Sequence, residues 1–101
     1  MPPVWTDLAG AAAMVKDGGL VALGGHTRRA PMALLRELLR QGRRDLSVAT
    51  VPTGGLNVDL LVAAGAVSSL HFAQVSLEEY GMAPHFRRAV EQGRLICFEY
   101  P

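Results

Sequence analysis

Residues 17–31 read Asp-Gly-Gly-Leu-Val-Ala-Leu-Gly-Gly-His-Thr-Arg-Arg-Ala-Pro, and this stretch decides the fold. The continuous apolar run Leu20–Leu23 predicts a strand that is buried on both faces. Gly24-Gly25 predicts a tight turn after that strand, and Pro31 suits the first turn of a helix, where its missing N–H costs nothing. This order brings bare backbone N–H groups to the end of a strand, where a negatively charged or polar ligand can approach closely.

Strand and helix alternate along the rest of the chain, with short connections between them. We expect helices over about 6–16, 31–41, 57–64 and 83–92, and further strands over 45–51, 66–75 and 94–100. Gly42, Gly65 and Gly93 are expected to end the last three helices. The pattern predicts an α/β fold with an open parallel sheet, flanking helices and right-handed crossovers. Because the chain stops just after a strand, we expect a truncated domain or one that a partner completes.

Composition narrows the classes of function. The 101 residues are 50% hydrophobic and 19% charged, with a formal net charge of +1. A nucleic-acid binder would need a basic excess, so we expect no nucleic-acid partner. The single Cys97 excludes an internal disulfide, and three scattered histidines form no metal-ligand cluster. The chain shows neither a signal peptide nor a membrane span, so we expect a cytoplasmic protein with no membrane partner.

Two glycine-bearing turns follow predicted strands. They are Gly24-Gly25-His26-Thr27 and Pro52-Thr53-Gly54-Gly55. Ligands of parallel sheets bind at the carboxyl ends of strands, which makes both turns candidate sites. Neither turn has the third glycine of a dinucleotide site or the Gly-Lys-Ser/Thr of a P-loop. The glycines either admit a ligand to the backbone or only let the chain turn tightly, and the spacing leaves both interpretations open.

Each polar residue of the first turn also has two interpretations. His26 either polarises a carbonyl or faces solvent. Thr27 either donates its hydroxyl to a ligand or caps the following helix. Arg28 and Arg29 either bind a phosphate or carboxylate or form a solvated pair.

Acidic residues occur at two further positions of interest. Glu78 and Glu79 are adjacent and could act as an acid–base pair, or they could lie in a solvated loop. Glu99 follows the apolar run Leu95–Phe98, so we expect it near the end of a buried strand, where the pKa of a carboxyl group can be perturbed.

Several segments in combination resemble one protein family. Asp17-Gly18, Val21-Ala22-Leu23, Gly24-Gly25 and Pro31 resemble the first signature of the family I CoA-transferases, with His26 where that signature usually has phenylalanine. Five further segments are similar to the glutaconate-type α subunit, namely residues 27–31, 36–46, 65–67, 78–81 and 86–89. The resemblance covers nearly the whole chain from Lys16 onward. It implies that residues 1–101 are the N-terminal part of a single α-subunit domain, on an open sheet like that of the phosphosugar isomerases.

The resemblance also implies an activity. These enzymes move coenzyme A from an acyl-CoA to a carboxylic acid, and the thioester is attacked by a glutamate of the homologous β subunit. We therefore expect no catalytic residue in this chain, a hetero-oligomer with a partner β subunit, and no activity without that partner. Coenzyme A is then a substrate, and neither a permanently bound cofactor nor a metal is expected. The substrate-binding residues would be Gly24, Gly25, His26 and Thr27, with Gly54 and Gly55 second.

Two other functions remain open. One is a CoA-thioester ring-cleaving hydrolase of the type found in steroid degradation, which resembles the same α subunit. Glu99 would be the natural acid of such a hydrolase. The other is a non-catalytic module that only binds or assembles. The residues do not identify the donor or acceptor acid.

Overall fold

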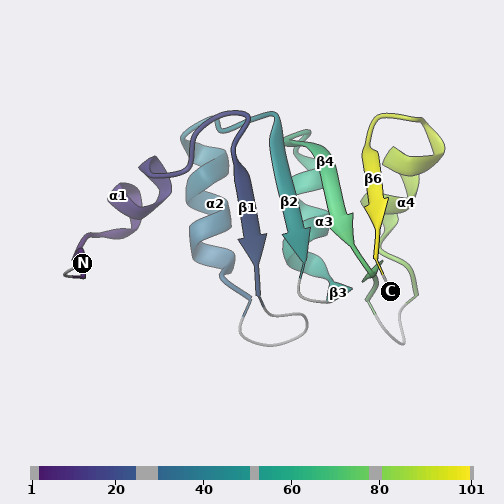
Figure 1. Cartoon of the computed structure of the whole chain (residues 1–101), viewed down its shortest axis with the longest axis horizontal. Helices are drawn as coiled ribbons and strands as arrows, with labels where there is room; N and C mark the ends of the chain where they lie inside the picture. The colour runs from purple at the N-terminus through teal and green to yellow at the C-terminus, as the bar shows by residue number, and fades with distance from the viewer. Residues whose placement is uncertain (1–2, 25–29, 51–52, 78–80, 101) are drawn as a thin grey trace.

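The computed structural model describes residues 3–24, 30–50, 53–77 and 81–100. Its main sheet has four parallel strands in the order β1-β2-β4-β6 (Figure 1). The strands are β1 (Leu20–Leu23), β2 (Leu46–Thr50), β4 (Val67–Phe72) and β6 (Ile96–Glu99). The helices are α1 (Leu8–Ala13), α2 (Met32–Arg40), α3 (Leu56–Ala63) and α4 (Pro84–Glu91). The predicted α/β fold, with an open parallel sheet and flanking helices, is confirmed.

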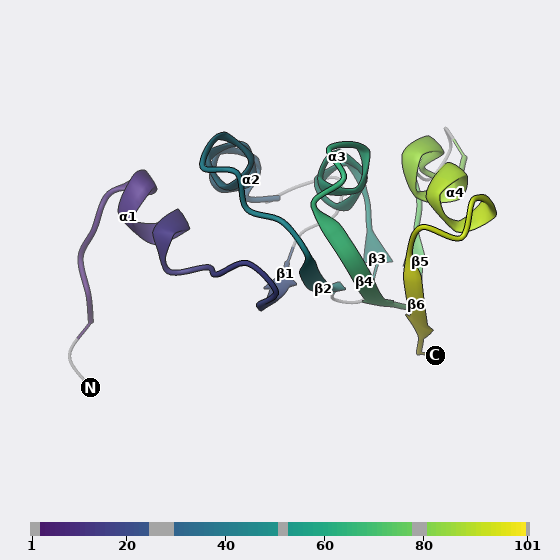
Figure 2. The same ribbon diagram turned by 90° about the horizontal axis from the view of Figure 1, so that it is seen from above.

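Helices cover one face of the sheet. Figure 2 shows α2, α3 and α4 on the same side of the strands. The strand order explains this, because crossovers of one hand that add each strand beside the last place their helices on one side. On the other face Leu20 is 70% exposed and Ile96 is 61% exposed. The expectation that β1 is buried on both faces is therefore wrong, and only Val21 and Leu23 pack against the core.

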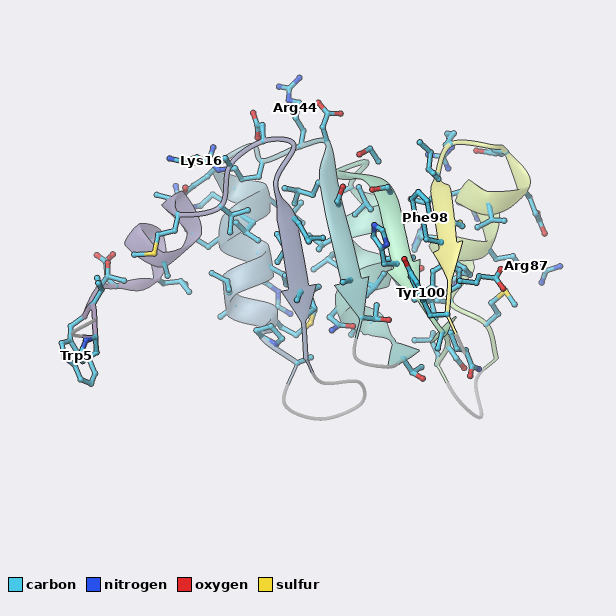
Figure 3. All side chains as sticks on the ribbon, viewed as in Figure 1. Trp5, Lys16, Arg44, Arg87, Phe98 and Tyr100 are labelled. Atoms are coloured by element: carbon cyan, nitrogen blue, oxygen red, sulfur yellow. The ribbon has the colours of Figure 1, made fainter. Side chains whose placement is uncertain are left out.

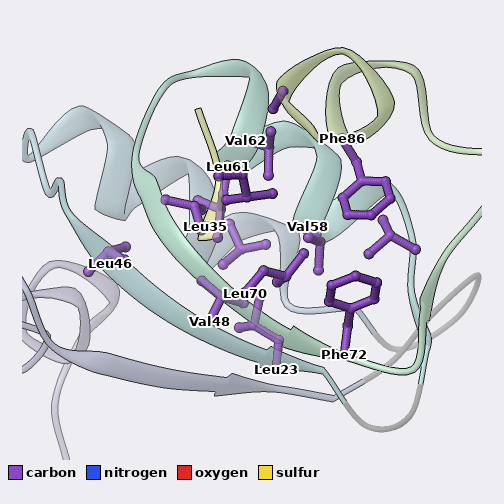
Figure 4. Packing of buried hydrophobic residues seen from close by; sticks show 14 of the residues in the cluster. Leu23, Leu35, Leu46, Val48, Val58, Leu61, Val62, Leu70, Phe72 and Phe86 are labelled. Carbon is purple, nitrogen blue, oxygen red and sulfur yellow. The ribbon is translucent and has the colours of Figure 1, made fainter. Parts of the chain in front are cut away.

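The hydrophobic core lies between the covered face and the helices (Figure 4). The apolar stripe of α2 points into it, with Leu35 and Leu38 fully buried. Helix α3 lies between α2 and α4 (Figure 2), so residues on several of its sides are buried, including Val58 and Leu61. Burial of these side chains is the main force that holds the helices on the sheet.

Local signals set the helix ends. Gly42, Gly65 and Gly93 follow the C-cap residues of α2, α3 and α4, with φ angles of 76°, 72° and 68°. These left-handed conformations favour glycine, and the predicted ends are confirmed. Asp7 caps α1, where its Oδ1 accepts the Gly10 N–H at 2.8 Å. That helix ends at Ala13, earlier than predicted.

A second, two-stranded parallel sheet pairs β3 (Thr53–Gly54) with β5 (Gln74–Val75). The predicted strand over 66–75 is thus two strands, β4 and β5. The Tyr100 N–H donates to the Phe72 carbonyl at 2.9 Å, at the carboxyl end of β4. After β4 the chain leaves the main sheet, and β5 pairs with β3, which follows β2.

The uncovered face carries an aromatic cluster at its β6 side. The ring of His71 stacks on Phe98, with centroids 4.6 Å apart and planes at 8°. Nδ1 of His71 lies 3.2 Å from the Tyr100 hydroxyl. Figure 3 labels Phe98 and Tyr100 on this face. Among the described residues, no helix is both long enough and apolar enough to span a bilayer.

Candidate functional site

The candidate site is the edge of the main sheet where the parallel strands end. Gly24 follows β1, Thr50 ends β2, Phe72 ends β4 and Glu99 ends β6. Figure 1 shows these four strands pointing towards the same edge of the sheet. Leu23 pairs with Thr50, and Phe72 pairs with Glu99. Parallel strands leave their carboxyl ends at one edge, where α/β proteins bind their ligands.

Gly24 has open space in front of it within the described part of the chain. It is exposed, it directly follows β1, and a Cβ built on it would meet no atom of a described residue, other than its chain neighbours, within 4 Å. It therefore lies at the carboxyl end of its strand, as a ligand-binding turn requires. Gly25, His26 and Thr27 lie outside the described residues, as do Arg28 and Arg29. Their roles remain predictions.

Gly54 and Gly55 of the second turn are buried. A Cβ on Gly54 would lie 2.6 Å from Cγ2 of Val58 and 2.9 Å from Cγ2 of Thr50. Gly55 donates its N–H to Oδ1 of Asn57 at 3.0 Å. The structure thus gives Gly54 a role in close packing between β3 and α3, and it gives the Gly55 N–H a partner within the protein. A contact of either glycine with substrate remains a prediction.

A cavity of about 730 Å³ lies beside this edge, between α4 and the ends of β4, β5 and β6. Its lining includes apolar residues and three charged ones. The apolar residues are Phe72, Ala73, Val75, Met82, Phe86 and Val90, and the charged ones are Arg87, Glu91 and Glu99. A cavity of this size and mixed lining is typical of small-molecule sites.

The charged residues of the cavity are exposed. Arg87, labelled in Figure 3, donates from Nε to Oε1 of Glu91 at 3.0 Å. Glu99 is exposed as well, so the expectation of a buried strand end is wrong there. The reason is that β6 is an edge strand of the sheet and only one of its faces is covered. The pair Glu78-Glu79 lies outside the described residues.

Glu99 also affects its neighbour Cys97. Burial, and secondly the charge of Glu99, raise the pKa of the Cys97 thiol above its ordinary value. A raised thiol pKa leaves little thiolate near neutral pH, which does not suit a nucleophile.

Asp59 is a buried acid that the sequence patterns did not single out. It is 3% exposed and lies on α3 among apolar residues. Its Oδ1 accepts the Phe86 N–H at 2.7 Å, and its Oδ2 accepts the His85 N–H at 3.4 Å. A signal was present in the sequence, because an acid inside an apolar helix needs a polar partner once it is buried. The partner itself, 27 residues away along the chain, was not readable.

The described residues offer no set of ligands for a metal ion. Within residues 3–24, 30–50, 53–77 and 81–100, no group of three or more His, Cys, Asp or Glu side chains is placed to hold an ion.

The sequence matches known proteins over most of its length. A family model described as Coenzyme A transferase matches residues 6–101. A 3-oxoadipate CoA-transferase subunit of Pseudomonas knackmussii is 39% identical over 79 residues, which cover 78% of this chain and 28% of that protein. The cholesterol ring-cleaving hydrolase IpdA subunit of Rhodococcus jostii is 37% identical over 87 residues, covering 84% of this chain and 29% of that protein. The chain thus spans less than a third of the length of these relatives.

Two solved structures are also similar. Glutaconate coenzyme A-transferase from Acidaminococcus fermentans superimposes with a TM-score of 0.85 at 32% identity, covering 94% of this chain and 31% of that one. A variant of the decarboxylase AibA/AibB superimposes with a TM-score of 0.82 at 37% identity, covering 97% of this chain and 38% of that one. The names include a transferase, a hydrolase and a decarboxylase, so similarity alone does not select one reaction.

Proposed function

Because this chain belongs to the coenzyme A transferase family, we propose that it is the N-terminal part of an α subunit that helps to move coenzyme A between an acyl-CoA and a carboxylic acid. The proposal is carried by Gly24, which is exposed at the carboxyl end of β1, and no described residue other than its chain neighbours lies within 4 Å of where its side chain would begin. Backbone N–H groups in such a turn can approach a thioester carbonyl or a carboxylate closely.

The proposed substrate contacts are the two glycine turns. Gly24, Gly25, His26 and Thr27 form the first, and Gly54 and Gly55 belong to the second, where the packing of Gly54 against Val58 holds the turn close to α3. The cavity of about 730 Å³ lies farther along the same edge, at α4 and the ends of β4 and β6, and offers room for the acyl group. Its apolar lining favours the hydrocarbon part of such a group.

The attacking glutamate is proposed to come from a β subunit, so that this chain binds and orients the substrate without a catalytic residue of its own. Coenzyme A enters as a substrate. The pairing with a second subunit is supported by the names of two relatives, each of which is called a subunit of its enzyme. We propose a hetero-oligomer that is inactive when this subunit is alone.

The test is an assay of CoA transfer from acetyl-CoA to a free carboxylic acid, with the chain alone and with a β subunit of the family. Transfer is expected only in the mixture. Gly24→Val should lower transfer by roughly tenfold or more, because a side chain there displaces the thioester. The control Arg36→Ala alters an exposed residue of α2 and should keep wild-type activity. Equal transfer by the wild type and Gly24→Val would overturn the assignment of this turn.

A separate observation, the position of Glu99, supports a second candidate function. Glu99 lies at the carboxyl end of β6 and on the lining of the cavity, where its carboxylate is exposed. We propose, as the alternative, hydrolysis of a CoA thioester with Glu99 as the participating acid, in line with the relative named as a cholesterol ring-cleaving hydrolase. Hydrolysis without an acceptor acid should then occur and be lost in Glu99→Gln. Persistent hydrolysis in that variant would remove the alternative.

A thermal-shift titration separates both reactions from a module that only assembles. Acetyl-CoA should raise the melting temperature of the folded complex if either reaction is correct. Absence of stabilisation, both alone and with the β subunit, would leave assembly as the function.

A further inference from the structure

We propose that Asp59 is a positioning residue for the cavity at the carboxyl edge, because it fixes the first turn of α4 and with it the wall that α4 gives to the cavity. The inference rests on the proposed function only in treating the cavity as part of the acyl-CoA site. Its structural part concerns α3 and α4 alone.

The first turn of α4 has two N–H groups to satisfy. Pro84 at the first helical position has no N–H, and the Arg87 N–H already donates to the Ala83 carbonyl at 3.0 Å. The remaining groups belong to His85 and Phe86. The N-cap residue, Ala83, has no side chain that could accept them.

Asp59 accepts both. Its two carboxylate oxygens receive the Phe86 N–H at 2.7 Å and the His85 N–H at 3.4 Å. A carboxylate at the start of a helix is also favoured by the helix dipole. The cap of α4 is therefore supplied by another helix, and this ties the position of α4 along its axis and its rotation to α3.

This attachment acts directly on the cavity. Phe86, one of the two residues held by Asp59, lines the cavity, and Arg87, Val90 and Glu91 continue the same wall. The ring of Phe86 also contacts the ring of Phe72 at the end of β4. Asp59 itself is not on the lining, so its effect on a ligand would pass through α4.

The experiment compares Asp59→Asn and Asp59→Ala in the full chain with its β subunit. The first variant keeps one oxygen acceptor and nearly the same shape, so it should fold even where the alanine variant does not. The control Leu38→Ala weakens the core at α2, away from the cavity lining. Amide hydrogen exchange at His85 and Phe86 is measured together with the affinity for acetyl-CoA, at a temperature where every variant is folded.

Asp59→Ala should lower the protection of the Phe86 amide by about tenfold or more relative to amides of α2, because a buried hydrogen bond to a charged group is lost. Acetyl-CoA should bind more weakly to it, and Asp59→Asn should fall between it and the wild type in both measurements. Leu38→Ala should lower the melting temperature without either local effect.

Unchanged protection at His85 and Phe86 in both Asp59 variants would overturn the inference, and so would unchanged acetyl-CoA affinity alongside lost protection. If the wild type binds no acetyl-CoA, the proposed function fails. The cavity wall is then probed by NMR contacts between the Phe86 and Phe72 rings. Loss of these contacts in Asp59→Ala, but not in Leu38→Ala, supports positioning, and their retention overturns it.

Discussion

The rings of Phe72 and Phe86 meet edge to face, with centroids 5.2 Å apart and planes at 79°. Phe72 ends β4 and Phe86 lies in the first turn of α4, so this contact joins the sheet to the helix at the candidate site. Both rings are nearly buried, with exposures of 6% and 7%. Aromatic pairs in this geometry are stabilising beyond the area that they bury.

Truncating Phe86 should therefore destabilise the fold. We expect Phe86→Ala to lower the free energy of unfolding by about 3–5 kcal/mol, because it removes the ring and leaves a cavity. Phe86→Leu should lower it by only about 1–2 kcal/mol, since much of the volume is kept. Urea unfolding measures both, and equal losses in the two variants would contradict the expected effect of the lost side-chain volume.

The two glycine turns should respond differently to a methyl group. Gly54→Ala places a Cβ 2.6 Å from Cγ2 of the fully buried Val58, so we expect a loss of about 1–3 kcal/mol through overpacking. The added methyl group of Gly24→Ala meets no atom of the described residues beyond its chain neighbours within 4 Å, so the loss should stay within about 0.5 kcal/mol. Thermal unfolding of the two variants, measured in parallel, provides the comparison. A destabilised Gly24→Ala would contradict the absence of close described neighbours around Gly24.

Stability at acidic pH should depend on Glu37. Hydrogen bonds from Arg40 and then from Gln41 lower the pKa of the Glu37 carboxyl from 4.5 to about 2. A lowered pKa in the folded state stabilises the protein fully above pH 4.5, and this contribution is lost as the pH falls towards 2. Glu37→Gln should therefore reduce the fall in unfolding free energy between these pH values. Urea titrations across the window test this, and identical slopes for the two proteins would refute it.

Gln41 connects the hydrogen-bonded side chains of Glu37 and Arg40 to α1. Its Nε2 donates to Glu37 at 2.8 Å and to the Ala9 carbonyl at 3.0 Å. Gln41→Ala should raise hydrogen exchange in α1 while leaving that of α3 unchanged, because the side chain donates a hydrogen bond from the end of α2 to α1. Equal exchange in α1 before and after the substitution would show that packing alone holds the helix.

Cys97 should react slowly with alkylating reagents. Burial and the nearby charge of Glu99 raise the pKa of its thiol, so less thiolate is present at a given pH. We expect iodoacetamide to modify native Cys97 more slowly than it modifies the urea-unfolded chain. Glu99→Gln should move the rate profile to lower pH. A native rate equal to that of the unfolded chain would contradict the shift.

Much of the fold was predictable because its signals are local. The alternation of apolar runs with glycine and proline predicted the parallel sheet, and Gly42, Gly65 and Gly93 predicted three helix ends. The position of Gly24 after a strand was predictable for the same reason. The second turn was recognisable too, but its internal partners were not. The Gly55 N–H is bound by Asn57, two residues further along the chain.

The sequence by itself determined the order of strands and helices and that Gly24 follows the end of β1, because these depend on the backbone preferences and polarity of neighbouring residues. Only the tertiary structure decided which face of β1 is covered, that Glu99 is exposed, and that Asp59 caps a helix beginning at Pro84. These features depend on contacts between segments far apart in the chain. The spacing of residues along one segment carries no information about which distant segment will pack against it.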